Sequence, residues 1–463
     1  MKSVIFVEPS GSSANVFDQY MKLPLLGSLY MGTILHNSGY KVKIINENIL
    51  GRRLSPVELK ADYVCFSSLT LNAGRIIELS RTIRQVYPQT KIIVGGIHAS
   101  LMPEEFTDIA DHVHIGEGEN TILDIVSGRY TEKIIKGSPV EDLDTLPVMN
   151  YDLLENARSM SVIPLMTSRG CPFNCNFCTV TKTFGRLYRK QSPKRVMEEI
   201  RNALRYFKIR DMFFYDDNLT ADRKRILELM DLLIGEKERI VWTAQLRADI
   251  AREPELLEKM YKAGCNRVYI GFESISDAVL SSLKKSQTRE DIEKAIRIIQ
   301  NRGISIHGMF MLGEDNDTIE NIRATVDFAI RHDISTVQFM ILTPLPGTEV
   351  YEKLKRENRL IHTDWNYYNG MYPVYYPAKM SAAVLQDETI SAYKKFYSFS
   401  RTALDVLYFG FNAFFDAMML KFDQLNKYDL TSIYIKLGAR YIIKKFLKIN
   451  KPYFDFLKKL EDK

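Results

Sequence analysis

The sequence predicts an α/β protein made of two successive domains of parallel strands and a helical carboxyl-terminal region. Two observations support this prediction. Short β-rich runs alternate with helical patterns over the first 140 residues, and six further strand-and-helix repeats follow before Pro346-Gly347. Such alternation is typical of parallel sheets with helices packed on their faces. The chain has 463 residues, 46% of them hydrophobic, which is ample for several buried cores.

The first domain is predicted over residues 1–140 as a doubly wound, Rossmann-like sheet. Its strands are expected at 3–7, 41–45, 63–67 and 91–94, with helices at 23–37 and 72–87. Ligands of such sheets bind beyond the carboxyl ends of the strands. Glycines in the strand-end loops at 95–98 and 116–119 let the backbone approach a large ligand closely.

The second domain is predicted over residues 159–348 as a partial (β/α)6 barrel of the TIM type. A lapse into Gly, Ser, Pro and acidic residues before it predicts a linker at 141–158. The barrel strands are expected at 162–167, 211–215, 241–245, 267–272, 305–311 and 336–342. In barrels of parallel strands the chemistry lies at the carboxyl ends.

Residues 349–463 are predicted to form a mainly helical substrate or cap domain. They are rich in aromatic side chains, for example at 365–368, 372–376 and 409–415, which either wall a substrate cavity or build an ordinary helical core. Near the end, one helical stripe is apolar and another is basic, with Lys436, Arg440, Lys444 and Lys448. Such a helix is typical of a solvated bundle face or of contact with an anionic membrane surface.

The charge distribution and the cysteine content narrow the cellular setting. The net charge of +6 equals that of residues 436–463, which hold nine Lys or Arg and three acidic residues. Basic residues confined to one terminal helix do not favour nucleic-acid binding. Five cysteines fit a reducing compartment, and the apolar run at 4–7 is too short for a secretory signal. We therefore expect a cytoplasmic protein without a transmembrane span, peripheral to the membrane if the terminal helix binds lipid.

Three of the five cysteines fall within eight residues, as Cys171-Pro172-Phe173-Asn174-Cys175-Asn176-Phe177-Cys178, directly after the first predicted barrel strand. Thiolates at these spacings can converge on one iron–sulfur cluster and leave one iron of a four-iron cluster without a protein ligand. Structural zinc usually takes four ligands, and an odd triplet disfavours disulfides, so both alternatives are less favoured. Cys65 and Cys265 are expected to be packing residues.

The C-x-x-x-C-x-x-C spacing, with the aromatic Phe177 inside it, resembles the cluster loop of radical S-adenosylmethionine (SAM) enzymes. The resemblance implies that Cys171, Cys175 and Cys178 bind a 4Fe-4S cluster and that SAM chelates its fourth iron. One electron then splits SAM into methionine and a 5′-deoxyadenosyl radical. An external one-electron donor such as flavodoxin or ferredoxin is implied.

Polar residues at the ends of later barrel strands match positions at which this family contacts SAM. The candidate SAM-binding residues are Phe177, Asp217, Asn218, Gln245, Arg247, Glu273, Ser274 and Gly313. Arg247 is suited to pair with a carboxylate through two parallel hydrogen bonds, and Glu273 to accept from ribose hydroxyls. Each residue alone is equally typical of a helix cap or a surface charge. Their order along the repeats favours a common site.

The first domain, the loop Gly95-Gly96-Ile97-His98-Ala99 and the segment Thr343-Pro344-Leu345-Pro346-Gly347-Thr348 resemble one branch of that superfamily. This branch carries an amino-terminal cobalamin-binding domain and includes the anaerobic magnesium-protoporphyrin monomethyl ester cyclase and carbon methyltransferases. The implied cobalamin contacts are Ser67, Ser68, Leu69, Gly95, Gly96, His98, Gly116 and Glu117. The Asp-x-His-x-x-Gly loop whose histidine coordinates cobalt in other cobalamin domains is absent from the sequence, so a histidine ligand is not expected. The alternative is a domain that has lost its ligand and only caps the barrel.

The resemblance implies a cobalamin-dependent enzyme in which the radical abstracts hydrogen from an unactivated carbon of a small or lipid-like substrate and methylcobalamin donates a methyl group. Ordinary acid–base catalysis does not reach such a carbon, whereas a radical needs only close approach and exclusion of water. Two alternatives stay open. One is a cobalamin-assisted oxidation or cyclisation, and the other is a non-catalytic cofactor-binding sensor.

Overall fold

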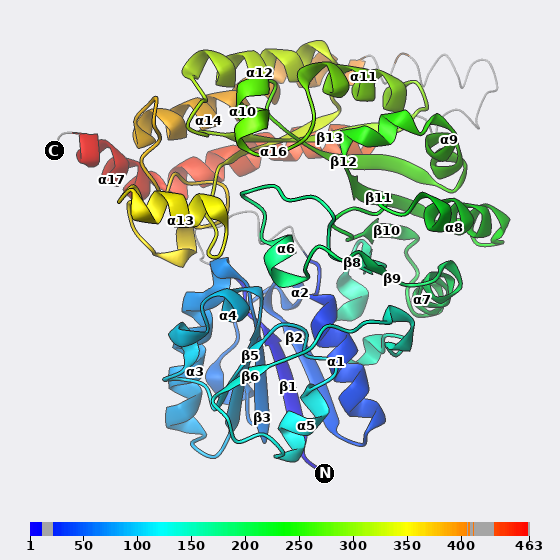
Figure 1. Ribbon diagram of the computed structural model, residues 1–463, viewed down its shortest axis with the longest axis vertical. Helices are drawn as coiled ribbons and strands as arrows, with labels where there is room; N and C mark the ends of the chain where they lie inside the picture. Colours follow the sequence, from blue (N-terminus) through cyan, green and yellow to red (C-terminus); the bar gives the residue numbers. More distant parts are fainter. Residues whose placement is uncertain (12–21, 405, 408–410, 412–429, 462–463) are drawn as a thin grey trace. The chain divides into compact units, whose positions relative to one another are not determined.

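The computed structural model describes residues 1–11, 22–404, 406–407, 411 and 430–461 (Figure 1). Of the aromatic stretch at 409–415, only Phe411 lies within the described residues. The chain divides into two compact units. Unit 1 comprises Met1–Ala244, Pro344–Asn358 and His362–Asn369, and unit 2 comprises Gln245–Thr343, Arg359–Ile361 and Gly370–Lys463.

The amino-terminal part of unit 1 is a parallel six-stranded sheet with the order β2-β1-β3-β4-β5-β6. The strands are β1 (Ser3–Glu8), β2 (Lys41–Asn46), β3 (Tyr63–Ser68), β4 (Lys91–Gly96), β5 (His112–Ile115) and β6 (Ile134–Lys136). The connecting helices are α1 (Leu26–Asn37), α2 (Glu47–Leu50), α3 (Ala73–Val86), α4 (Ile97–Leu101) and α5 (Ile122–Ser127). In Figure 1, α1 and α3 flank opposite faces of this sheet. The doubly wound prediction is confirmed, and the strand order reverses direction between β1 and β3, where such sheets bind ligands.

Local sequence patterns explain these elements. The apolar run of β3 is buried on both faces, as expected of an inner parallel strand. In α3, Ile76, Leu79 and Ile83 are spaced along one helical face and are fully buried. The segment predicted as a linker is packed rather than free, because Leu143 and Tyr151 within it are buried.

The second sheet has the order β14-β13-β12-β11-β10-β7. Its strands are β7 (Ile163–Leu165), β10 (Asp211–Phe214), β11 (Val241–Leu246), β12 (Cys265–Glu273), β13 (Ser305–Leu312) and β14 (Thr336–Ile341). Its helices include α7 (Pro193–Tyr206), α8 (Arg223–Gly235), α9 (Pro254–Lys262), α10 (Asp277–Ser282), α11 (Arg289–Gln300) and α12 (Ile319–Arg331). The prediction of a barrel-type sheet of six strands with parallel pairing is confirmed. Helix α7 begins at Pro193, because the Ser192 hydroxyl caps the N–H of Arg195 at 3.2 Å and Pro193 occupies the first turn.

The carboxyl-terminal region is mainly helical, as predicted. Its helices are α13 (Glu349–Arg356), α14 (Ala382–Phe396), α16 (Leu430–Ile449) and α17 (Lys451–Glu461). The basic stripe predicted on α16 is wrong at one position, because Lys436 is only 5% exposed and lies on the packed side of the helix. Among the described residues, the structure contains no helix that combines the length and the apolar character needed to cross a bilayer.

Candidate cofactor sites

The three clustered cysteines lie on a loop of unit 1 that a short two-stranded ladder closes at its base. β8 (Ser168–Arg169) pairs antiparallel with β9 (Arg189–Lys190), so residues 170–188 form one loop. Gly170 begins this loop with a φ of +87°, and a Cβ there would overlap the carbonyl oxygen of Leu187. Glycine alone fits this conformation and this space. The path of the loop therefore requires a glycine immediately before the first cysteine.

All three thiols of the loop are partly shielded from water. Burial, with smaller contributions from the nearby Asp217, Cys175 and Cys171, raises the pKa of Cys178 to about 12. Stable thiolates here therefore need a cationic group beside them. Among the described side chains, no three His, Cys, Asp or Glu groups are placed to hold one metal ion. Three thiols on one loop fit an iron–sulfur cluster, which distributes its cysteine ligands over several irons.

Asp216, which the sequence interpretation passed over, anchors the start of the cluster loop to β10. Its carboxylate accepts hydrogen bonds from the backbone N–H of Thr167 at 3.1 Å, from the Thr167 hydroxyl at 2.9 Å and from the Ser168 hydroxyl. Asp216 is fully buried, and burial raises its pKa. The signal in the sequence was the pair of adjacent aspartates after β10, of which one holds the scaffold and the other faces the loop.

The other predicted contacts of unit 1 lie near this anchor. Asp217 is half-buried, and burial together with the charge of Asp216 raises its pKa to about 7. Asn218 is buried, and its side-chain oxygen accepts from the Thr220 hydroxyl at 3.4 Å. Phe177 is half-buried within the cysteine loop. The charge of Asp217 raises the pKa of Cys178, which indicates that the Asp217 carboxyl group lies close to the cysteines.

In unit 2, a lysine that the sequence interpretation missed joins the ends of β11 and β12. The Arg247 guanidinium donates to the carbonyl of Lys285 at 2.9 Å, and the Lys285 ammonium donates to the Glu273 carboxylate at 2.7 Å. All three side chains are buried. Glu273 also has a φ of +61°, which is uncommon outside glycine. Lys285 therefore fixes the orientation of the Glu273 carboxyl group, and the two residues form one candidate SAM-binding element.

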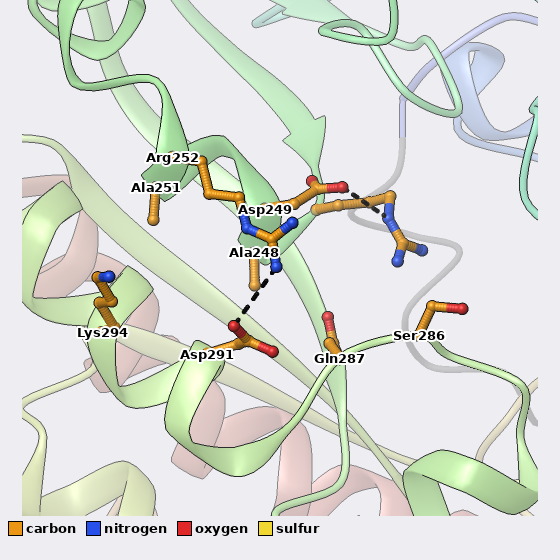
Figure 2. A pocket seen from close by; sticks show the side chains of 9 residues that line it. Ala248, Asp249, Ala251, Arg252, Ser286, Gln287, Asp291 and Lys294 are labelled. Atoms are coloured by element: carbon orange, nitrogen blue, oxygen red, sulfur yellow. Dashed lines mark ion pairs between the residues drawn. The ribbon is translucent and has the colours of Figure 1, made fainter.

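A polar hollow of about 410 Å³ borders Arg247 on one side (Figure 2). Figure 2 shows Arg252 facing Asp291 across it, with Gln287 and Ser286 on the neighbouring loop. The Arg252–Asp291 pair is 3.6 Å long and Arg252 is 74% exposed, so this pair contributes little energy. The hollow gives solvent access to one side of the Arg247 neighbourhood.

The remaining predicted residues of unit 2 have local structural partners. The Ser274 hydroxyl accepts from the N–H of Ser276 at 3.0 Å. Gly313 donates its N–H to Asp317 at 3.0 Å and accepts from the Tyr375 hydroxyl with its carbonyl oxygen. Gln245 is half-buried in β11. These groups belong to unit 2, whereas the cysteines, Asp217 and Asn218 belong to unit 1.

A second hollow, of about 420 Å³, lies in the doubly wound part of unit 1 between the sheet and helices α1 and α5. Four of the eight predicted cobalamin contacts line it, namely Ser67, Gly95, Gly96 and Gly116. Gly96 has a φ of +97°, and a Cβ there would lie 2.6 Å from the backbone of Ser68. Only glycine therefore fits where the end of β4 passes the end of β3 beside the hollow, and a strand end of this kind lets a large ligand such as a corrinoid approach the backbone closely.

The sequence interpretation missed Met31, Gly118 and His114, which also line this hollow. The His114 ring lies 2.7 Å from the Thr121 hydroxyl, and burial lowers its pKa. The remaining predicted contacts lie elsewhere. The Ser68 hydroxyl bonds the Gly95 carbonyl at 2.7 Å, and Leu69 is half-buried at the end of β3.

His98 is fully buried beside the sheet and does not line the hollow. One ring nitrogen lies 3.2 Å from the Thr70 hydroxyl and the other lies 3.2 Å from the Glu105 carboxylate. Glu105 also accepts from the indole N–H of Trp365 at 2.9 Å. Both nitrogens of His98 therefore have protein partners, which supports a packing role for this histidine.

Glu117 belongs to a buried ionic cluster, which we define as Glu117, Glu119, Arg169 and Arg189. Arg169 contacts Glu117 at 2.5 Å and Glu119 at 2.6 Å, and Arg189 contacts Glu117 at 3.0 Å. All four side chains are at most 5% exposed. Arg169 lies two residues before Cys171, and Glu117 follows Gly116 of the glycine-lined hollow. The ionic cluster therefore connects the loop beside the hollow to the base of the cysteine loop.

Glu8 at the carboxyl end of β1 is a buried carboxyl group with one unsatisfied oxygen. Its Oε2 accepts from the Asn46 side chain at 2.8 Å and from the N–H of Leu25 at 2.9 Å. Its Oε1 is buried and has no hydrogen-bond partner within the described chain. Burial raises the pKa of Glu8 to about 7. A strand-end carboxyl in this state is available to a ligand that can share its proton.

We expect Glu8 to lower the stability of the protein as the pH rises from about 4.5 to about 7, with no further loss above that range. The folded state holds the Glu8 proton up to about pH 7, whereas the unfolded chain releases it near 4.5. Folding therefore takes up a proton between these values, and above pH 7 ionised Glu8 costs about 3 kcal/mol. In thermal unfolding, Glu8→Gln should raise the Tm at pH 8 and have a smaller effect at pH 5.5. The control Glu104→Gln changes an exposed carboxylate and should leave the Tm unchanged at both pH values. If the Tm of Glu8→Gln equals that of the wild type at both pH values, the prediction is wrong.

Two family models match the chain. The model described as the radical SAM superfamily matches residues 165–329, and the model described as the B12 binding domain matches residues 16–126. The first match contains all three loop cysteines, and the second contains the glycine edge of the hollow.

Relatives and solved structures agree with these matches. The chain is 29% identical to bacteriochlorophyllide d C-8(2)-methyltransferase of Chlorobaculum tepidum, over 75% of this chain and 80% of that protein. It is 26% identical to the anaerobic magnesium-protoporphyrin IX monomethyl ester cyclase of Cereibacter sphaeroides, over 73% of this chain and 60% of that protein. OxsB, a cobalamin-dependent SAM radical enzyme solved with aqua-cobalamin and SAM bound, has a TM-score of 0.67 at 15% identity, over 97% of this chain and 75% of that chain. This last likeness shows the fold.

Proposed function

Because the chain belongs to the radical SAM superfamily, in the branch that carries a cobalamin-binding domain, we propose that it is an enzyme that methylates an unactivated carbon of a small or lipid-like substrate. The cofactors of this branch are a 4Fe-4S cluster, SAM and cobalamin. The observation that carries the proposal is that unit 1 contains both a three-cysteine loop and a glycine-lined hollow. A protein with one cofactor needs only one of them.

When bound, the cluster supplies the electron that cleaves SAM, and cobalamin supplies the methyl group. The chain's own residues hold these groups. Cys171, Cys175 and Cys178 provide the thiolates, while Asp216 fixes the strand end from which their loop departs. Glu273, oriented by Lys285, offers a fixed acceptor for hydroxyl groups of SAM. Such preorganised acceptors orient a substrate without a reorganisation cost during the reaction.

We further propose that an external one-electron donor, of the flavodoxin or ferredoxin kind, reduces the cluster. The sequence supports this because only three of its five cysteines are grouped. Cys65 and Cys265 are buried singly, and burial raises the pKa of both thiols. The chain therefore has no second cysteine set that would relay electrons through a cluster of its own.

A second candidate function is a cobalamin-assisted oxidation or ring closure. The similarity to the anaerobic cyclase of Cereibacter sphaeroides favours it specifically. Both reactions use the same cofactors, so the fate of the methyl group of SAM distinguishes them.

The experiment that tests the proposed function supplies SAM with a trideuterated methyl group to the reduced, cobalamin-loaded protein together with an extract of metabolites and lipids. We expect a product that carries the intact labelled methyl group, and 5′-deoxyadenosine formed alongside it. An oxidised or cyclised product without label would favour the second candidate. The absence of any 5′-deoxyadenosine, even after reduction, would favour a non-catalytic cofactor-binding protein.

A further inference from the structure

Unit 2 gathers its most exposed apolar side chains on two neighbouring helical segments. Among the described residues, ten large hydrophobic side chains are at least 55% exposed, and seven of them lie between residues 399 and 441. These seven are Phe399, Leu404, Leu407, Phe411, Tyr434, Leu437 and Tyr441. Single exposed apolar residues are ordinary, but a cluster of this kind marks an interaction site. We call these seven residues the apolar patch.

Helical spacing and one contact relate four members of the apolar patch, namely Phe399, Tyr434, Leu437 and Tyr441. On α16, Tyr434, Leu437 and Tyr441 follow each other at intervals of three and four residues, so they share one helix face. The Arg440 guanidinium of α16 lies over the ring of Phe399, 5.3 Å from its centroid. The helical segment that begins at Phe399 therefore lies beside α16.

The exposed face of α16 changes from apolar to basic along the helix. Lys444 and Lys448 follow Tyr441 on the same face and are exposed, and Lys451 at the start of α17 is exposed as well. Lys436 is buried and takes no part. The result is a surface with aromatic and aliphatic side chains at one end and lysines at the other.

We propose that this surface docks the protein on an anionic lipid bilayer, with the apolar patch in the headgroup region and the lysines on the phosphates. Amphipathic helices of this composition lie in the membrane interface, and each lysine near an anionic surface adds about fivefold to binding. Protein interfaces, by contrast, are depleted in lysine. A second copy of this surface would bring like charges together. Charge complementarity therefore favours the anionic bilayer, and the proposal does not depend on the reaction proposed above.

Co-sedimentation of the full reconstituted chain with vesicles tests this proposal. One vesicle set is phosphatidylcholine alone, and the other is an equal mixture of phosphatidylcholine and phosphatidylserine. We expect binding to the mixed vesicles, weakened by more than about 25-fold in K444E/K448E, which removes two positive charges and adds two negative ones, and abolished in L437D/Y441D. The controls K41E/K60E and V57D change exposed residues of unit 1 and should bind like the wild type.

All substituted residues are solvent-exposed, so the variants should retain their iron content and circular dichroism. Each variant is checked for both before the vesicle assay. Failure of the wild type to bind the mixed vesicles, or equal binding by every variant, would overturn the proposal. So would a dimer that L437D/Y441D dissociates in the absence of vesicle binding, since the patch would then be a protein interface.

Discussion

Replacing Cys175 with alanine is expected to abolish 5′-deoxyadenosine formation and to remove most of the iron from the anaerobically reconstituted protein. Cys175 lies in the middle of the three-cysteine loop, and no other cysteine of the described structure lies free at the surface to replace it. Loss of a metal's outer hydrogen-bond partner typically costs about 10–100-fold in affinity or activity. Loss of a direct ligand should exceed this range. Iron content and product chromatography measure the two effects.

Cys265→Ala is the matched control for this prediction. Cys265 is also a cysteine, but it is 1% exposed within β12 and has no thiol neighbours in its strand. The variant should keep its iron and its SAM cleavage. If Cys175→Ala instead retained both at wild-type levels, the assignment of the cysteine loop would be wrong.

Arg169→Met is expected to destabilise the protein by about 3–5 kcal/mol, the usual cost of leaving a buried charge unpaired. The substitution removes the 2.6 Å ion pair of Glu119 and one of the two arginines that contact Glu117. Arg169 also lies two residues before Cys171, and its partner Glu117 follows Gly116 of the glycine-lined hollow. The iron content and the cobalamin content should therefore fall together. Urea unfolding and cofactor quantitation measure these effects.

Two further variants separate this prediction from a general loss of packing. The double variant E119Q/R169M should be less destabilised than the sum of its single variants, because the unpaired carboxylate is removed. Arg129→Met breaks an exposed ion pair with Asp124, in which the Arg129 side chain is 74% exposed. This substitution should cost less than about 1 kcal/mol. Additive costs in the double variant would contradict the ionic coupling.

The strands of both sheets could be predicted because buried parallel strands are continuous apolar runs. β3 and β13 lie within one or two residues of their predicted ranges for this reason. β6 was not predicted as a strand, and β5 was implied only by the strand-end loop at 116–119. They are short, and β5 (His112–Ile115) contains two histidines while β6 (Ile134–Lys136) ends in a lysine, so their local pattern carries little strand signal.

The candidate site was predictable where it depends on spacing and not where it depends on tertiary contact. The three cysteines are close in sequence, whereas Arg169 and Glu117 are separated by 52 residues. No local pattern pairs two residues at such a distance. The same limit explains Lys285, which reaches Glu273 only because the loop after α10 returns to the end of β12. His98 was predicted from its glycine loop, and the direction of its ring depends on Thr70 and Glu105.

The most direct test of the account is electron paramagnetic resonance of the reduced, reconstituted protein before and after SAM is added. Three cysteine ligands leave one iron of the cluster open, so SAM should change the spectrum of the cluster while the iron content stays at about four per chain. A spectrum that is the same with and without SAM would show that no iron is open to it. That result would contradict the account.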